Sequence, residues 1–198
     1  MRFAFLSAAI LFFAVAAPVV EAQAPPTFHV SRPPKSTISF EVDASVALKG
    51  IFNKWESNFT CPSTDALACT LEINIEADSV DTGSGMKNGK LKGGDFFDVK
   101  ENPYITFKST KIVMKDPKTF EIDGDFTIRG VTKQEQLTMI VEGAGTRVAT
   151  VNGTMAFDRE DYGMDKGIPF IKIANRVQVT CDLHATRTSG PPLVFSKQ

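Results

Sequence analysis

Few side chains in this sequence could act as catalytic groups. The two histidines, His29 and His184, are its only imidazole bases, and neither lies beside a recognisable nucleophile signature. Asp95 and Asp98 flank two phenylalanines and could form an acid pair, but aspartates in such segments more often cap turns by binding backbone amides. No nucleophile elbow, phosphate-binding loop or zinc-protease motif occurs. The sequence therefore predicts no catalytic residue and no cofactor other than a bound ligand.

Three lysines beside a glycine-rich segment form a second group with potential chemistry. Lys87, Lys90 and Lys92 could attract a pyrophosphate or another polar head group. The competing interpretation is a solvated surface, which such runs of charge form more often. We therefore treat these lysines as head-group candidates.

The first 22 residues have the layout of a secretory signal peptide. Arg2 precedes an apolar run over residues 3–20, and small residues follow, with cleavage expected after Ala22. A cut after Ala24 ranks second because it would leave Pro25 at the new N-terminus. The alternative is an uncleaved anchor, although the run is short for a bilayer span. Residues 23–198 then form one domain with no stable transmembrane anchor.

Charge and cysteine content narrow the class of protein further. The formal net charge is −1, without the clustered Lys and Arg that nucleic-acid binding requires. In an exported protein Cys61 and Cys69, close in sequence, are expected to form a disulfide. Cys181 is in phase with apolar neighbours, which predicts a buried thiol. No second Cys or His at ligand spacing supports a zinc site.

Alternating apolar and polar residues dominate the chain and predict an all-β fold. Eight strands are expected, at residues 37–44, 50–60, 69–77, 104–114, 119–129, 133–142, 147–157 and 174–185. A short helical turn is expected at residues 86–91, within a glycine-rich loop. Eight antiparallel strands can close into a barrel that removes exposed edges. A two-sheet sandwich is the alternative.

The phase of the alternation identifies the side chains that should face the interior. Those expected to line a tunnel are Phe40, Val42, Phe52, Ile73, Ile75, Phe96, Ile105, Phe107, Phe126, Ile128 and Val179. The same residues would equally suit an ordinary packed core. Hydrophobicity alone does not separate these two interpretations.

A series of short segments resembles the YceI-like, polyisoprenoid-binding family of the bacterial periplasm. The segments are 39–42 (SFEV), 50–52 (GIF), 81–83 (DTG), 91–99 (LKGGDFFDV), 103–110 (PYITFKST), 124–133 (GDFTIRGVTK) and 157–164 (FDREDYGM). The resemblance spans nearly all of the mature chain. Lys90 stands where the family commonly has His, Lys92 stands where Arg is usual, and segment 46–49 lacks a usual His.

The resemblance implies an elongated, lipocalin-like, eight-stranded antiparallel barrel whose tunnel holds an isoprenoid or another long-chain amphiphilic lipid. It also implies a non-enzymatic periplasmic carrier or sequestering protein, and a homodimer is a reasonable expectation. Two rival functions remain open. One is an enzyme acting on quinones or lipids, which would need Lys90, Asp95, Asp98 and Arg129 to gather inside the barrel. The other is a stress-related interaction module with a filled core and an exposed apolar patch.

Overall fold

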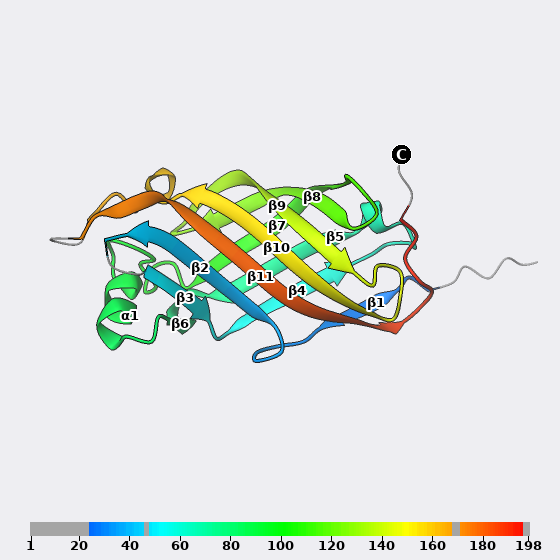
Figure 1. Ribbon diagram of the computed structural model, residues 1–198. Coiled ribbons are helices and arrows are strands. Elements are labelled where there is room, and N and C mark those ends of the chain that lie inside the picture. Colours follow the sequence, from blue (N-terminus) through cyan, green and yellow to red (C-terminus); the bar gives the residue numbers. More distant parts are fainter. Residues whose placement is uncertain (1–23, 46–47, 168–170, 196–198) are drawn as a thin grey trace, which may run out of the picture.

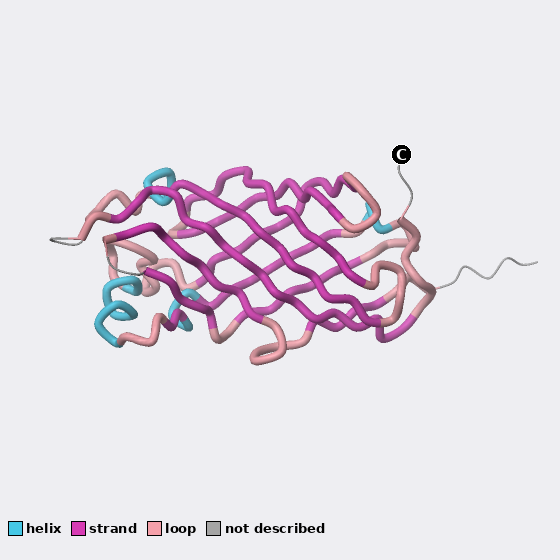
Figure 2. Tube along the Cα trace, in the orientation of Figure 1, coloured by secondary structure: helices cyan, strands magenta, loops and turns pink. Residues whose placement is uncertain are grey.

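The computed structural model describes residues 24–45, 48–167 and 171–195. The signal peptide expected over residues 1–22 lies outside this part of the chain. Within it, long strands cross an elongated body obliquely (Figure 1). Coloured by secondary structure, the same view shows strands forming nearly all of the wall, with helix confined to short segments near the ends (Figure 2). The expectation of an all-β fold is confirmed.

The described residues form eleven strands, one α-helix and three short 3-10 helices. The strands are β1 (Thr27–Val30), β2 (Thr37–Ala44), β3 (Leu48–Phe52), β4 (Trp55–Thr60), β5 (Thr70–Glu76), β6 (Val80–Asp81), β7 (Tyr104–Met114), β8 (Thr119–Ile128), β9 (Val131–Glu142), β10 (Val148–Asp158) and β11 (Ile173–Ser189). The helical segments are η1 (Ala66–Ala68), η2 (Ala77–Ser79), α1 (Gly85–Lys92) and η3 (Arg159–Tyr162). Helix α1 confirms the helical turn expected in the glycine-rich loop.

All eleven strands belong to one antiparallel sheet, which excludes the two-sheet sandwich. Its order is β4-β5-β7-β8-β9-β10-β11-β2-β3-β6, and β1 pairs with β11. Strand β1 also lies against β4, where the Phe28 and Phe59 rings are 5.4 Å apart. Just after β1, Arg32 pairs with Glu56 of β4 at 2.8 Å. The sheet is therefore curled, with a concave inner face and a convex outer face.

The expectation of eight strands was incomplete at the N-terminal side of the fold. Residues 50–60, expected as one strand, are split into β3 and β4 by a turn at Asn53 and Lys54. The Asn53 N–H donates to the carbonyl of Ser79 at 3.2 Å, and the Lys54 carbonyl accepts from the N–H of Glu76 at 3.0 Å. These contacts come from segments distant in sequence, which strand alternation does not reveal. The short strands β1 and β6 were not predicted.

Strand β8 shows how alternation builds the core. Its side chains alternate strictly between half-buried and buried, and Phe120, Ile122, Phe126 and Ile128 face inward. Gly124 occupies the remaining inward position, where an added Cβ would lie 2.5 Å from the Phe107 ring of β7. The glycine therefore gives the Phe107 ring room to lie across the strand. The inward positions that the alternation predicts in β8 are therefore the positions that pack in the core.

Candidate functional site

Among the described residues, apolar side chains of the concave face line at least three cavities. The helix-end cavity, about 70 Å³, lies beside α1 and includes Leu91, Phe96 and Phe97 in its wall. The central cavity, about 30 Å³, lies further along, among Ile73, Phe107 and residues of neighbouring strands. The far-end cavity, about 130 Å³, lies at the opposite end, near the C-terminus. The interior of this structure is therefore a row of separate cavities along the sheet.

All eleven residues expected to line a tunnel lie on the walls of the first two cavities. Phe40, Val42, Phe52, Phe96 and Ile128 line the helix-end cavity, Ile73 and Phe107 line the central cavity, and Ile75, Ile105, Phe126 and Val179 line both. The residues shared by both cavities form the constriction between them. In this structure their packed side chains interrupt a continuous passage.

The far-end cavity is the largest of the three, and the sequence pattern did not predict it. Aromatic side chains of Phe28, Phe59, Phe120 and Phe195 contribute to its wall. Phe28 lies on the short strand β1, within a proline-rich segment that did not resemble a strand. Phe195 follows the last strand, where no periodicity identifies an inward position. The alternation of Phe28 and Val30 could have indicated that β1 is a strand with one face toward the interior.

The C-terminal segment closes this end of the fold over the loop that joins β4 to β5. The Val194 N–H donates to the Thr64 carbonyl at 2.7 Å, and the Ala66 N–H donates to the Val194 carbonyl at 3.1 Å. Leu193 is buried against the disulfide of this loop, and the Phe195 ring lies 5.6 Å from that of Phe120.

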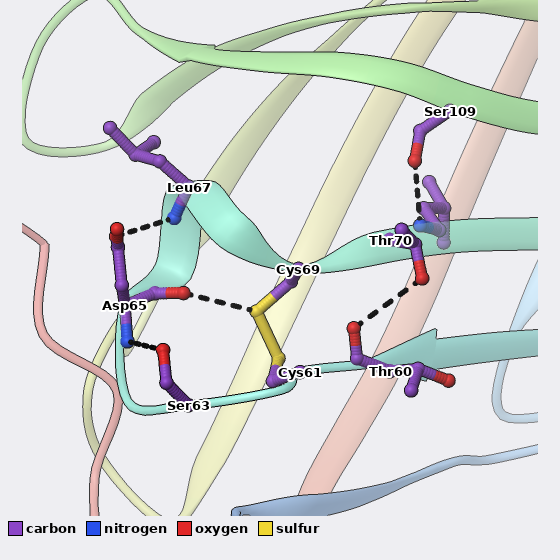
Figure 3. Close-up of a disulfide and its surroundings, with 9 residues drawn as sticks. Thr60, Cys61, Ser63, Asp65, Leu67, Cys69, Thr70 and Ser109 are labelled. Carbon is purple, nitrogen blue, oxygen red and sulfur yellow. Dashed lines mark hydrogen bonds between the residues drawn. A yellow bond between two sulfur atoms is a disulfide. The ribbon is translucent and has the colours of Figure 1, made fainter.

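A disulfide joins Cys61 to Cys69 across this loop (Figure 3). The predicted pairing is thus confirmed. Within the loop, the Asp65 carboxylate accepts a hydrogen bond from the Leu67 N–H at 2.9 Å and so caps η1. The disulfide and the cap both fix the loop on which the C-terminal segment rests.

The three head-group candidates lie on α1, outside the cavities that the described residues enclose. Lys90 Nζ pairs with the Asp95 carboxylate at 2.6 Å, and their side chains are 38% and 46% exposed. The hydrogen bond and charge of Lys90 hold the pKa of the Asp95 carboxyl below its usual range. Lys87 and Lys92 are half-buried. From the same segment, Leu91 and Phe96 reach the helix-end cavity.

The polar residues that an enzyme would require lie near α1, at one end of the molecule, and outside the apolar interior. The Arg129 guanidinium donates to the Gly94 carbonyl at 2.7 Å and to the carbonyl of Gly163. Arg129 therefore ties two loops together, from a left-handed turn position with a φ of 54°. Asp98 has a φ of 51°, and its carbonyl accepts from the Asn102 N–H at 2.8 Å. These contacts organise loops around α1.

Tyr162 is fully buried beside the helix-end cavity, where its ring packs edge-on against Phe126 and Phe157. Its hydroxyl donates to Glu135 at 2.8 Å. Burial, and then the hydrogen bond and charge of Glu135, raise the pKa of the Tyr162 hydroxyl. The free thiol of Cys181 is also buried, as expected, and burial raises its pKa to about 12.

Because the pKa of Tyr162 is raised in the folded protein, we expect the protein to lose stability at high pH. The ordinary pKa of the tyrosine hydroxyl is 10.0. Above that pH the unfolded chain releases a proton that the folded protein retains, so the free energy of unfolding should fall by up to about 1.4 kcal/mol per pH unit. Urea denaturation at pH 8 to 11.5 would measure this slope, in a Cys181→Ala background that prevents thiol exchange. Tyr162→Phe should flatten the slope, and equal slopes would contradict the prediction.

Two features are absent from the residues that the structure describes. No helix in that part of the chain has both the length and the apolar character needed to cross a bilayer. In the same ranges, no three His, Cys, Asp or Glu side chains gather in a way that could hold a metal ion.

Comparisons with known sequences place this chain among related bacterial proteins. The model of the YceI-like domain family matches residues 30–185. A UPF0312 protein of Vibrio cholerae is 29% identical over 122 residues, which cover 59% of this chain and 65% of that protein. The match thus spans less than two thirds of that relative's length.

Solved structures show the same fold. BcnA of Burkholderia cenocepacia superposes with a TM-score of 0.69 at 25% identity, covering 77% of this chain and 97% of BcnA. A polyisoprenoid binding domain from Saccharophagus degradans gives a TM-score of 0.65 at 15% identity, covering 82% of this chain and 99% of that domain. At 15% identity, the similarity to the Saccharophagus domain shows the fold alone.

Proposed function

The chain belongs to the YceI-like domain family, and from this premise we propose that it binds a polyisoprenoid or another long-chain amphiphilic lipid inside its curled sheet. The protein would sequester or carry this ligand without chemical conversion. Binding proteins of this kind need an enclosed apolar space and few polar contacts.

The row of apolar cavities is the observation that carries the proposal. It follows the long axis of the sheet from α1 to the C-terminal segment. A long chain would occupy the row if the side chains at the constrictions change rotamer, as interface side chains commonly do on binding. Met155, on the wall of the central cavity, has the flexible side chain suited to such a change.

The energetics of burial are sufficient without covalent chemistry. Ten methylene groups at about 0.8 kcal/mol each would contribute about 8 kcal/mol before ordering costs, which corresponds to roughly micromolar affinity. The curled, eleven-stranded sheet would surround such a ligand with its concave face.

A periplasmic location is part of the same proposal. It is supported by the disulfide between Cys61 and Cys69, which suits an oxidising compartment, and by family membership. It also rests on the expected signal peptide over residues 1–22. A homodimer remains part of the proposal, to be tested by the mass of the purified protein in solution.

Native mass spectrometry tests ligand binding directly. Protein purified from a bacterial host should carry an adduct that organic extraction releases as an isoprenoid or a fatty amphiphile. After extraction, the protein should take up added farnesol or dodecanoate. Absence of both a bound lipid and any uptake would overturn the proposal.

A pair of adjacent substitutions on β11 tests whether the interior is the binding site. Ala185 lines the far-end cavity, whereas its neighbour His184 is exposed on the outer face. Ala185→Trp should fill the cavity and weaken lipid uptake at least tenfold, because excluding only two methylenes removes about 1.6 kcal/mol. The matched control His184→Trp should leave uptake unchanged. Equal uptake by both variants would place binding elsewhere.

A further inference from the structure

We propose that Arg147 and Arg187 form an anion-binding subsite at the far-end cavity, so that the preferred ligand is a long-chain lipid with an anionic head. This inference rests on the proposed function and adds the class of head group and its position. Both arginines lie on the wall of the far-end cavity, and they are the only charged side chains among the described residues that line it. Arg147 is exposed and Arg187 is half-buried, which places the subsite where the cavity meets the surface.

The two arginines lie opposite each other at the end of the β10–β11 pair that is near β1 (Figure 1). The register pairs Val148 with Thr186. One residue beyond this pair, the Arg187 N–H donates to the Arg147 carbonyl at 2.8 Å. Opposed residues of antiparallel strands point to the same face of the sheet, and like charges at such positions are destabilising. An anion bound between the two side chains would replace this repulsion by attraction.

Neither guanidinium pairs with a carboxylate of the residues that the structure describes. Glu142, at the end of β9, pairs instead with Lys118 at 2.9 Å. Arg187 Nη1 donates to the carbonyl of Gly190, whereas Arg187 Nε is buried without a hydrogen-bond partner in the described part of the chain. A carbonyl satisfies one donor but does not neutralise the charge. Both cations therefore remain available to an anionic group, and arginine suits a carboxylate or phosphate because its planar N–H groups match two oxygens.

A second unpartnered polar atom belongs to a residue on the same wall. The Ser57 hydroxyl of β4 is buried and has no hydrogen-bond partner among the described residues. The other inward positions of β4 carry the aromatic side chains of Trp55 and Phe59, so Ser57 interrupts an apolar face. A buried hydroxyl without a partner costs free energy, which a ligand oxygen within reach would recover. Ser57 and Arg187 thus both favour an oxygen-bearing head at this end of the interior.

The side chains behind the two arginines indicate what must be attached to the anion. The next inward pairs of β10 and β11 are apolar, and all four residues line the cavity: Ala149 with Ala185, and Val151 with Leu183. The small alanines leave space beside the strands, and the larger apolar side chains beyond them would bury a chain. A small inorganic anion would gain nothing from these contacts, whereas an anionic group on an alkyl or isoprenoid chain would use both. The tail would then extend from the arginines along the row of cavities toward α1.

Three ligands that share a chain and differ in head group test this inference on the unmodified, lipid-free protein. Dodecanoate, dodecyl phosphate and dodecan-1-ol would be compared at pH 8 by displacement of a fluorescent fatty-chain probe. Both anions should bind at least about tenfold more tightly than the alcohol, because only they can pair with the arginines. Equal affinities for the anions and the alcohol would overturn the anionic subsite while leaving lipid binding intact. Failure of all three to bind would overturn the proposed function itself.

Substitutions locate the subsite. Arg187→Gln and Arg147→Gln should each reduce the preference for the anions over the alcohol at least about threefold, with alcohol affinity unchanged. Arg176→Gln is the matched control, because Arg176 is exposed on the outer face of β11, and it should preserve the preference. Loss of the preference in Lys90→Gln, with retention in both subsite variants, would place the head group at α1 and overturn the assignment. Should Arg187→Gln fail to fold by circular dichroism, Arg147→Gln decides the question, since its side chain is exposed.

Discussion

Replacing Phe126 by alanine should lower the free energy of unfolding of the lipid-free protein by about 3–5 kcal/mol, the usual cost of deleting a buried aromatic ring. Phe126 is 5% exposed and lies on the constriction between the helix-end and central cavities. Its ring centre lies 5.0 Å from that of Phe157 and 5.4 Å from that of Tyr162. Alanine would remove these contacts and join the two cavities, a void that the rigid strands around it cannot fill by collapse.

Urea denaturation followed by far-ultraviolet circular dichroism measures this loss. Tyr104→Ala is a matched control, since it removes an aromatic ring that is 52% exposed on the same sheet and should cost less than about 1 kcal/mol. Phe126→Leu, which keeps much of the volume, should cost less than about 1.5 kcal/mol. A loss for Phe126→Ala no larger than that for Tyr104→Ala would mean that this constriction is not tightly packed in solution.

Local sequence patterns were sufficient where one face of a strand packs uniformly. The inward positions of β8 follow from strict alternation, and both Phe126 and Ile128 lie on a cavity wall as the phase required. The segment at residues 95–110 divides in the same way. Phe96 reaches the helix-end cavity from the turn after α1, whereas from β7 Phe107 reaches the central cavity and Ile105 lines both. A side-chain period of two leaves no other solution for these strands.

Features that depend on contacts between distant segments could not be predicted. The turn between β3 and β4 is held by the backbone of Ser79 and Glu76. The far-end cavity needs β1 and the C-terminal segment, which meet only in the folded chain. Arg159 belongs to the segment at residues 157–164, but its burial follows from the carbonyls of Met164 and Ala174 around it. Charge alone would have assigned Arg159 to the surface.

Replacing both Cys61 and Cys69 by serine should lower the free energy of unfolding by about 2.5 kcal/mol, because the unfolded chain would regain the entropy of a loop of about nine residues. The disulfide closes the loop that carries the contacts of Thr64 and Ala66 with Val194. Serine hydroxyls would also weaken the small apolar cluster that buries Leu193. The variant should therefore lose protection of the C-terminal segment as well as global stability.

Two measurements separate these effects. Chemical denaturation gives the loss in global stability, and carboxypeptidase digestion under native conditions reports release of residues 193–195, which should be faster in the variant. Cys181→Ala provides the control, because Cys181 lies on β11, within the main core rather than the cluster around the disulfide. It should leave the rate of C-terminal digestion unchanged. If the double serine variant digests as slowly as the unmodified protein, the C-terminal segment is held by the Phe120 and Phe195 contact rather than by the disulfide loop, and access to the far-end cavity would not depend on the redox state of the cysteines.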